Sequence, residues 1–342
     1  MGITKIKIEN FTVFKKADIN FASGMNVLIG ENGTGKTHLL KLMNSLLRSS
    51  ESRMDDLNQY FLTKEQDSFI NDNSVALDIQ MAISHSGVHN TIEIHYENGI
   101  LEDNSHDISF TFLQNDEKHI LKMVDSKYSP VFIPAKDILT HSKSFMSLYN
   151  KFEMPFDRIY YDIISKSLLP NLKEVPEIGK SILPTLENIM DGKVIVENEI
   201  FYIQKTNGDK VEFSMEAEGV KKIAIIWQLI MNESIISKSI LFWDEPEANL
   251  NPALYKDVVE ILLALSRNGV QVFIATHDYI FAKYIEVLMK SNDDIAFHSL
   301  YKTEKNSVEC EMGTTFRDLK QNAIIFSFDK LLDRVFALDI GD

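Results

Sequence analysis

The sequence predicts an α/β fold with two lobes, in which a mixed sheet is joined by antiparallel strands and a helical insertion. A glycine-rich loop lies between an apolar strand at 26–29 and a helix at 38–47. Two later apolar runs, 239–243 and 270–275, have the continuous pattern of buried parallel strands. Alternating stretches at 76–83, 91–96 and 108–112 are typical of antiparallel strands.

The glycine-rich loop matches the phosphate-binding pattern in all its required positions. It consists of Gly30, Glu31, Asn32, Gly33, Thr34, Gly35, Lys36 and Thr37. Glycines allow backbone N–H groups to surround phosphates, and the following helix contributes its positive N-terminus. The Lys36 ammonium is expected to reach the β- and γ-phosphates, and Thr37 to bind Mg²⁺. The loop therefore predicts that the chain binds ATP or a similar nucleoside triphosphate with Mg²⁺.

A second motif follows the apolar run at 239–243, which ends in Asp244 and Glu245. An acid pair at the end of a buried strand, in a chain with a phosphate-binding loop, is the Walker B pattern. We expect Asp244 to complete the magnesium site with Thr37. Glu245 is predicted to orient or deprotonate the attacking water.

The segment after Walker B predicts a helix and one further strand. Asn251 is expected to cap the helix, Pro252 to open it and Gly269 to end it. The strand at 270–275 then leads to His277. Because ligands of open α/β sheets collect at the carboxyl ends of the strands, we expect Thr37, Asp244, Glu245 and His277 to converge on one γ-phosphate.

These motifs, in this order, resemble the ATP-binding-cassette (ABC) ATPases, as does the turn at 247–252. The stretches 3–11 and 26–33 are similar to the soluble branch that contains the SMC, RecF and OLD proteins. The resemblance implies one composite ABC-type head, with lobe I at 1–137, a helical insertion at 138–190 and lobe II at 191–342. The insertion is too short for a long coiled-coil arm, and we expect no separate nuclease domain of the kind that OLD proteins carry.

The resemblance also implies a homodimer in which two heads enclose ATP and a signature loop of one subunit completes the site of the other. Gly219 is the candidate for that loop. The chain departs from the family here, because Ala217 and Glu218 stand where a serine and a glycine are usual. Lys136 occupies the chain position of the Q-loop glutamine and is a candidate phosphate or water contact.

The composition bears on nucleic-acid binding, on disulfide bonds and on membrane association. The chain has 342 residues, a net charge of −15 and a pI of about 5.1, so bulk charge does not support nucleic-acid binding. A single cysteine, Cys310, excludes an intramolecular disulfide framework. The absence of an apolar run of about 18 residues predicts a cytoplasmic protein with no membrane segment.

Three classes of function remain. The favoured one is a soluble ATPase whose ATP-driven head dimerisation regulates a protein effector; the resemblance alone suggests phage defence or DNA repair. An ABC transporter subunit is the second, although the opening at Asn10-Phe11 and the atypical signature argue against it. A nucleotide-gated binding module without hydrolysis is the third, and ATP turnover would exclude it.

The end of the chain predicts an amphipathic helix. Its apolar residues fall at i, i+3, i+4, i+7 and i+8, and they are Phe328, Leu331, Leu332, Val335 and Phe336. We expect the chain's own second lobe to cover this stripe.

Overall fold

The structure is a computed structural model that describes residues 2–48, 59–62, 76–85, 88–98, 106–114, 117–119, 130–152, 154–304 and 307–339. The chain divides into two compact units. Unit 1 comprises residues 1–39, 67–122 and 275–342, and unit 2 comprises residues 40–66 and 123–274. The segment 275–342 therefore groups with the amino-terminal segment, whereas the expected ranges 1–137, 138–190 and 191–342 placed it with lobe II.

Unit 1 contains a sheet of antiparallel strands in the order β2-β1-β4-β5-β6-β7. Its strands are β1 Gly2–Phe11, β2 Phe14–Asn20, β4 Ala76–His85, β5 Val88–Asn98, β6 His106–Gln114 and β7 Glu117–His119. The three strands expected from alternation are confirmed as β4, β5 and β6. In β1, Ile6 and Ile8 are buried, whereas Lys7 between them is exposed, as the two-residue period of a strand requires.

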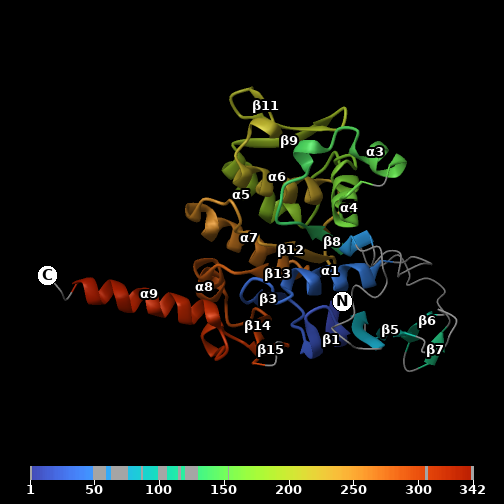
Figure 1. Ribbon diagram of the computed structural model, residues 1–342. Helices are drawn as coiled ribbons and strands as arrows, with labels where there is room; N and C mark the ends of the chain where they lie inside the picture. The colour runs from blue at the N-terminus through green and yellow to red at the C-terminus, as the bar shows by residue number, and fades with distance from the viewer. Residues whose placement is uncertain are drawn as a thin grey trace. The chain divides into compact units, whose positions relative to one another are not determined.

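The same unit contains the strands β15-β14-β3, which carry the phosphate-binding loop (Figure 1). These strands are β3 Met25–Ile29, β14 Ile295–Lys302 and β15 Val308–Gly313. All five residues of β3 are buried, and the strand pairs in parallel with β14, with Val27 opposite Phe297. This pairing is the physical reason that the end of the chain groups with its beginning.

Unit 2 contains the strands β13-β12-β8 and a separate antiparallel sheet, β11-β10-β9. The strands are β8 Pro130–Ile133, β9 Gly192–Glu197, β10 Ile200–Lys205, β11 Lys210–Glu212, β12 Ile240–Asp244 and β13 Gln271–Thr276. Phe242 of β12 lies opposite Phe132 of the parallel strand β8, and their rings stack. Every residue of β12 is buried, as its continuous apolar run predicts.

The helices of unit 2 begin with the greater part of α1, whose first residues belong to unit 1. They are α1 Lys36–Leu47, α3 Phe145–Lys151, α4 Arg158–Ser167, α5 Gly179–Met190, α6 Glu218–Met231 and α7 Tyr255–Arg267. The predicted cap before α7 is confirmed, since the Asn251 side chain accepts a hydrogen bond from the Ala253 N–H at 3.0 Å, and a 3-10 turn opens at Pro252. None of the helices in the described part of the chain is long and apolar enough to cross a membrane.

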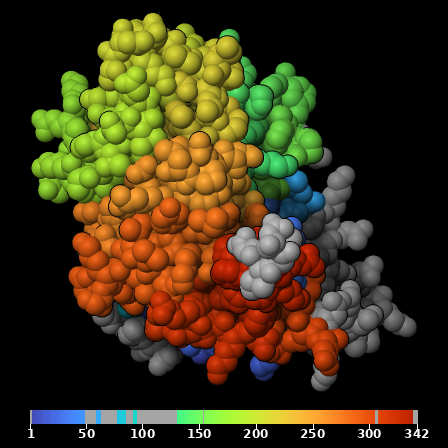
Figure 2. Space-filling view, turned by 90° about the vertical axis from the view of Figure 1, so that its left-hand side faces the viewer, coloured from blue at the N-terminus to red at the C-terminus, as the bar shows by residue number. Residues whose placement is uncertain are grey.

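The carboxy-terminal helix α9, Ala323–Asp339, is exposed along its apolar stripe. The exposed fractions of Leu331, Val335 and Phe336 are 54%, 44% and 61%. The expectation that the second lobe covers this stripe is therefore wrong. Helix α9 packs on α8, Tyr279–Leu288, only near its beginning and then extends away from it (Figure 1). Figure 2 views the molecule from the left-hand side of Figure 1 and shows the side chains of α9, in red, at the surface.

Candidate nucleotide site

The phosphate-binding loop has its lysine folded into it. Lys36 is the first residue of α1 and is 7% exposed. Its Nζ donates to the carbonyl oxygens of Gly30 at 2.7 Å and Glu31 at 2.9 Å. Hydrogen bonds from the side chain to the first two carbonyls of the loop hold the ammonium against the loop, where lysines of such loops meet phosphates.

Two glycines of the loop are required by its surroundings. Gly35 has a φ of +84°, and a Cβ there would lie 2.6 Å from a methyl group of Val13. Gly30 has no room for a Cβ, because the Leu300 carbonyl oxygen would be 2.3 Å away. The loop is thus seated directly on β14 and on the turn between β1 and β2, which fixes its position in unit 1.

His277 lies on a turn that is held at both ends. It follows β13 and is exposed, and the neighbouring Asp278 N–H donates to the Thr276 hydroxyl at 3.0 Å. The Asp278 carboxylate caps α8 by accepting from the Phe281 N–H at 2.7 Å. These bonds set the direction in which the backbone presents His277.

An open groove of about 450 Å³ lies between the phosphate-binding loop and α9. Its lining includes the polar residues Glu31 and His277 and the apolar residues Ile324, Phe328 and Leu331. Within unit 1, the structure therefore brings the loop and the predicted histidine to one surface.

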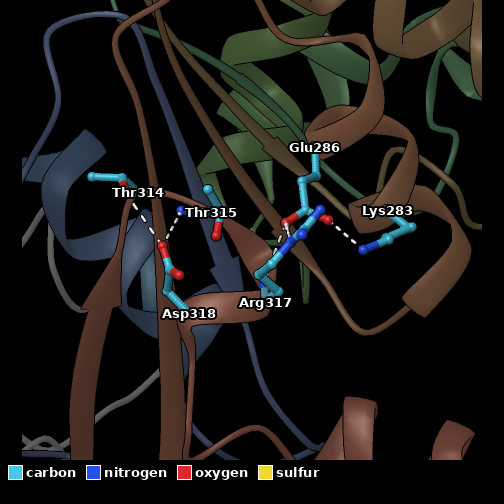
Figure 3. A network of polar contacts seen from close by, with 6 residues as sticks. All are labelled: Lys283, Glu286, Thr314, Thr315, Arg317 and Asp318. Carbon is cyan, nitrogen blue, oxygen red and sulfur yellow. Dashed lines mark hydrogen bonds and ion pairs between the residues drawn. The ribbon is translucent and has the colours of Figure 1, made fainter. Parts of the chain in front are cut away.

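Helix α8 is anchored at its far end by a polar network (Figure 3). The Glu286 carboxylate, buried in the protein, accepts from Lys283 and from the backbone and side chain of Arg317, at 3.2 and 3.3 Å. Burial alone would raise the pKa of Glu286, but the hydrogen bonds from Lys283 and Arg317 hold its pKa below the usual value. In the same loop Asp318 accepts from the Thr315 N–H at 3.1 Å. The network fixes α8, and with it the turn that carries His277.

The Walker B residues lie in unit 2 at the end of β12. Asp244 is buried, with an exposed fraction of 8%, and Glu245 follows with a φ of +47°. A left-handed conformation is unfavourable for a residue with a side chain, by about 1–2 kcal/mol. It turns the chain sharply after the strand, and the Ala248 N–H donates to the Glu245 carbonyl at 3.0 Å to close the turn.

A residue that the sequence analysis did not assign holds this turn. Lys222 of α6 is 5% exposed, and its Nζ donates to the carbonyl oxygens of Glu245 at 2.8 Å and Pro246 at 3.4 Å. Burial lowers the pKa of Lys222 to about 8, although Glu247 and other carboxylates nearby oppose this shift. The signal for this contact was present in the sequence, because Lys221 and Lys222 interrupt an otherwise apolar helix.

The signature candidate, Gly219, lies in the first turn of α6. A Cβ at Gly219 would lie 2.9 Å from the end of the Leu250 side chain, so α6 packs closely against the turn after Walker B at this glycine. Lys221, next to Lys222, donates to Glu218 at 2.7 Å and lies 3.6 Å from Asp137.

The predicted residues thus fall into two sets. The loop and His277 belong to unit 1, whereas Gly219, Asp244, Glu245 and the Q-loop candidate Lys136 belong to unit 2. Lys136 is exposed and lines a different groove, of about 410 Å³, with Tyr160. The alignment of the two sets on one nucleotide stays a prediction.

The oxygen donors among these residues are of the kind that Mg²⁺ binds. Thr37 offers a hydroxyl and Asp244 a carboxylate, and Mg²⁺ is usually bound by one or two such groups together with substrate phosphates. No group of three or more His, Cys, Asp or Glu side chains arranged to hold a metal occurs among the residues that the structure describes. The residues therefore fit a metal that is bound together with a nucleotide.

Known proteins resemble the chain in sequence and fold. It is 23% identical over 334 residues to an ATP/GTP phosphatase of Helicobacter pylori, covering 85% of this chain and 89% of that protein. A stretch of 62 residues is 39% identical to a DNA double-strand break repair Rad50 ATPase of Methanococcus maripaludis, covering 17% of this chain and 6% of that protein. The fold is similar to an SMC head domain with an extended coiled coil, solved bound to the C-terminal domain of ScpA and derived from Pyrococcus furiosus. That comparison has a TM-score of 0.57 and 12% identity, and it covers 98% of this chain and 100% of the other.

The fold comparison confirms the predicted ABC-type ATPase head, with its mixed sheet and antiparallel strands. Residues 25–282 match a family described as "AAA domain, putative AbiEii toxin, Type IV TA system". The chain therefore belongs to this family, and it is an AAA ATPase of the ABC type.

Proposed function

We propose that the chain binds Mg-ATP and hydrolyses it. In this proposal the loop from Gly30 to Thr37 holds the phosphates, and Thr37 and Asp244 supply protein ligands to Mg²⁺. Glu245 orients and deprotonates the attacking water, and His277 contacts the γ-phosphate. Mg²⁺, when bound, neutralises the charge that develops on the phosphate oxygens.

The observation that carries the proposal is the position of Lys36. A buried lysine at the start of α1, bonded to the carbonyls of Gly30 and Glu31, is the arrangement that balances phosphate charge in loops of this kind. The Helicobacter pylori relative, whose name is ATP/GTP phosphatase, supports the reaction over nearly the whole chain.

We further propose that two copies enclose ATP between them, with Gly219 of one copy at the nucleotide of the other. Gly219 lies in the first turn of α6, where N–H groups and the helix dipole favour an anion. These amides compensate for the signature hydroxyl that the chain lacks.

The dimer regulates a protein effector, in phage defence or DNA repair. The family description and the repair ATPase among the relatives support that setting.

The test combines turnover with molecular mass. Glu245→Gln keeps the shape of the side chain but removes the base, so hydrolysis should fall by about 10²–10⁴-fold while ATP still binds. Light scattering should show the variant as a dimer in ATP and a monomer in ADP. Turnover of Glu245→Gln at the wild-type rate would remove Glu245 as the base. A monomer in ATP would remove the proposed dimer and leave the nucleotide chemistry standing.

A further inference from the structure

Lys222 is buried beside the base that we propose for ATP hydrolysis, and its contacts are to backbone rather than to a carboxylate. Its Nζ lies 2.8 Å from the Glu245 carbonyl oxygen and 3.4 Å from that of Pro246. The side chain reaches them from α6, 23 residues earlier in the chain. A charged donor to a buried carbonyl is stronger than a neutral one, by roughly a factor of two.

The Glu245 backbone needs such support. Its φ of +47° is unfavourable for glutamate and persists only where the surroundings determine it. The Ala248 N–H and the Lys222 ammonium both donate to the Glu245 carbonyl. Of these two bonds, the one from Ala248 is part of the turn itself, whereas the one from Lys222 connects the turn to another element.

The direction of the Glu245 side chain depends on this backbone, because Cα fixes the angle between the carbonyl and the Cβ bond. A rotation of the peptide that relieves the left-handed conformation would swing the carboxylate away. General-base catalysis requires the base within about 2.6–3.2 Å of the proton it removes, so a small swing is sufficient to stop it.

We propose that Lys222 is a positioning residue that fixes the Glu245 carboxylate through the Glu245 carbonyl. This inference rests on the proposed role of Glu245 as the base. Lys222 and Gly219 lie in the first two turns of α6, and Gly219 packs against Leu250, so the start of α6 contacts the Walker B turn at two points in unit 2. Movement of the start of α6 is therefore transmitted to the base of the same chain.

The experiment compares Lys222→Met in two backgrounds. In the wild-type chain, Lys222→Met should lower kcat about 10-fold or more, because the base is misplaced but present. The KM and the Kd for ATP should stay within about twofold, since the phosphate-binding loop is untouched. In the Glu245→Gln chain, single-turnover hydrolysis should not change further when Lys222→Met is added, because Lys222 acts only through the base.

A matched control is Lys205→Met. Lys205 is also partly buried, and its Nζ donates to a backbone carbonyl, that of Met190, at 3.0 Å, and pairs with Glu216. It does not contact the Walker B turn, so its removal should leave kcat unchanged. Thermal melting of both variants should show that each is folded. If Lys222→Met does not fold, Lys222→Leu, which also removes the donor, replaces it, and Lys222→Gln, which keeps an N–H donor, should recover part of the rate.

The outcomes separate this inference from the proposed function. Lys222 would not be a positioning residue if Lys222→Met hydrolysed ATP at the wild-type rate while Glu245→Gln was slow. An equal loss from Lys222→Met in both backgrounds would also overturn the inference, because the effect would not pass through Glu245. If Glu245→Gln itself hydrolysed normally, the proposed base would be wrong, and the inference would fail with it.

Discussion

The rings of Tyr279 and Phe328 stack face to face, with centroids 3.9 Å apart and planes 9° from parallel. Tyr279 is two residues after His277, and Phe328 is half-buried, whereas the other four residues of the apolar stripe of α9 are exposed. The stack therefore joins the histidine turn to the terminal helix. Tyr279 also contacts Phe316 edge-on, so its ring is held from two sides.

We predict that Phe328→Ala lowers the free energy of unfolding by about 1–3 kcal/mol, through the lost stack and lost apolar burial. Val335→Ala, on the exposed part of the same helix, should change it by less than about 0.5 kcal/mol. Urea unfolding of both variants measures the difference. Equal destabilisation by the two substitutions would mean that α9 is packed along its whole length.

Replacing the loop lysine should separate nucleotide binding from folding. In Lys36→Ala the charge that balances the phosphates is gone, so calorimetry should detect no binding of Mg-ATP at concentrations that saturate the wild type. Lys41→Ala is the control on the same helix, because Lys41 bonds to Asp157 and to the Tyr60 carbonyl and not to the loop. ATP affinity that survives in a folded Lys36→Ala variant would contradict the assignment of the loop.

The histidine should matter for turnover more than for binding. His277 is exposed and lines the same groove as Glu31, and we propose that its side chain contacts the γ-phosphate. His277→Ala should lower kcat about 10-fold or more, with a smaller loss of ATP affinity and none of ADP affinity. His277→Gln keeps a hydrogen-bond donor and should recover part of the rate. A parallel loss of ATP and ADP affinity would indicate that the histidine supports the turn and not the reaction.

The fold class followed from the sequence because each motif had its own structural context. The buried strands β3 and β12, the loop at 30–37 and the glycine at 269 that ends α7 are all locally encoded. The compact units were not predictable in this way. They depend on the parallel pairing of β3 with β14. These two strands are about 270 residues apart, and no local sequence pattern in either strand indicates that they pair.

The site was predictable only where a motif defines it. Lys222 was missed because a lysine in a helix is usually solvated. The two lysines within an apolar helix marked the position, but the sequence does not show that the partner is a backbone carbonyl. The stripe of α9 was read correctly as one helical face, but helical periodicity does not say what covers the face. Which residues cover the face is decided by tertiary structure, and among the residues that the structure describes only the first turns of α9 pack against another element, α8.

His298 lies on β14, opposite Leu28 of the neighbouring strand β3, and is fully buried. Its Nε2 is 3.1 Å from Asn26 Oδ1. That oxygen already accepts the Ala22 N–H, so Nε2 carries the proton. Nδ1 has no hydrogen-bond partner in the described part of the chain, so a second proton would be buried unpaired. Burial accordingly lowers the pKa of His298 from 6.5 to about 4.

The sign of the pH effect follows from these two values. Between pH 6.5 and 4 the unfolded chain binds a proton at this histidine and the folded chain does not, so stability rises with pH and is lost as the pH falls through this window. From pH 7 to 5 the loss should be about 2 kcal/mol. His298→Gln, which cannot titrate, should be less stable at pH 7 but lose about 2 kcal/mol less than the wild type over the same interval. Urea unfolding at a series of pH values tests this, and parallel stability curves for the two proteins would show that His298 does not resist protonation in the folded state.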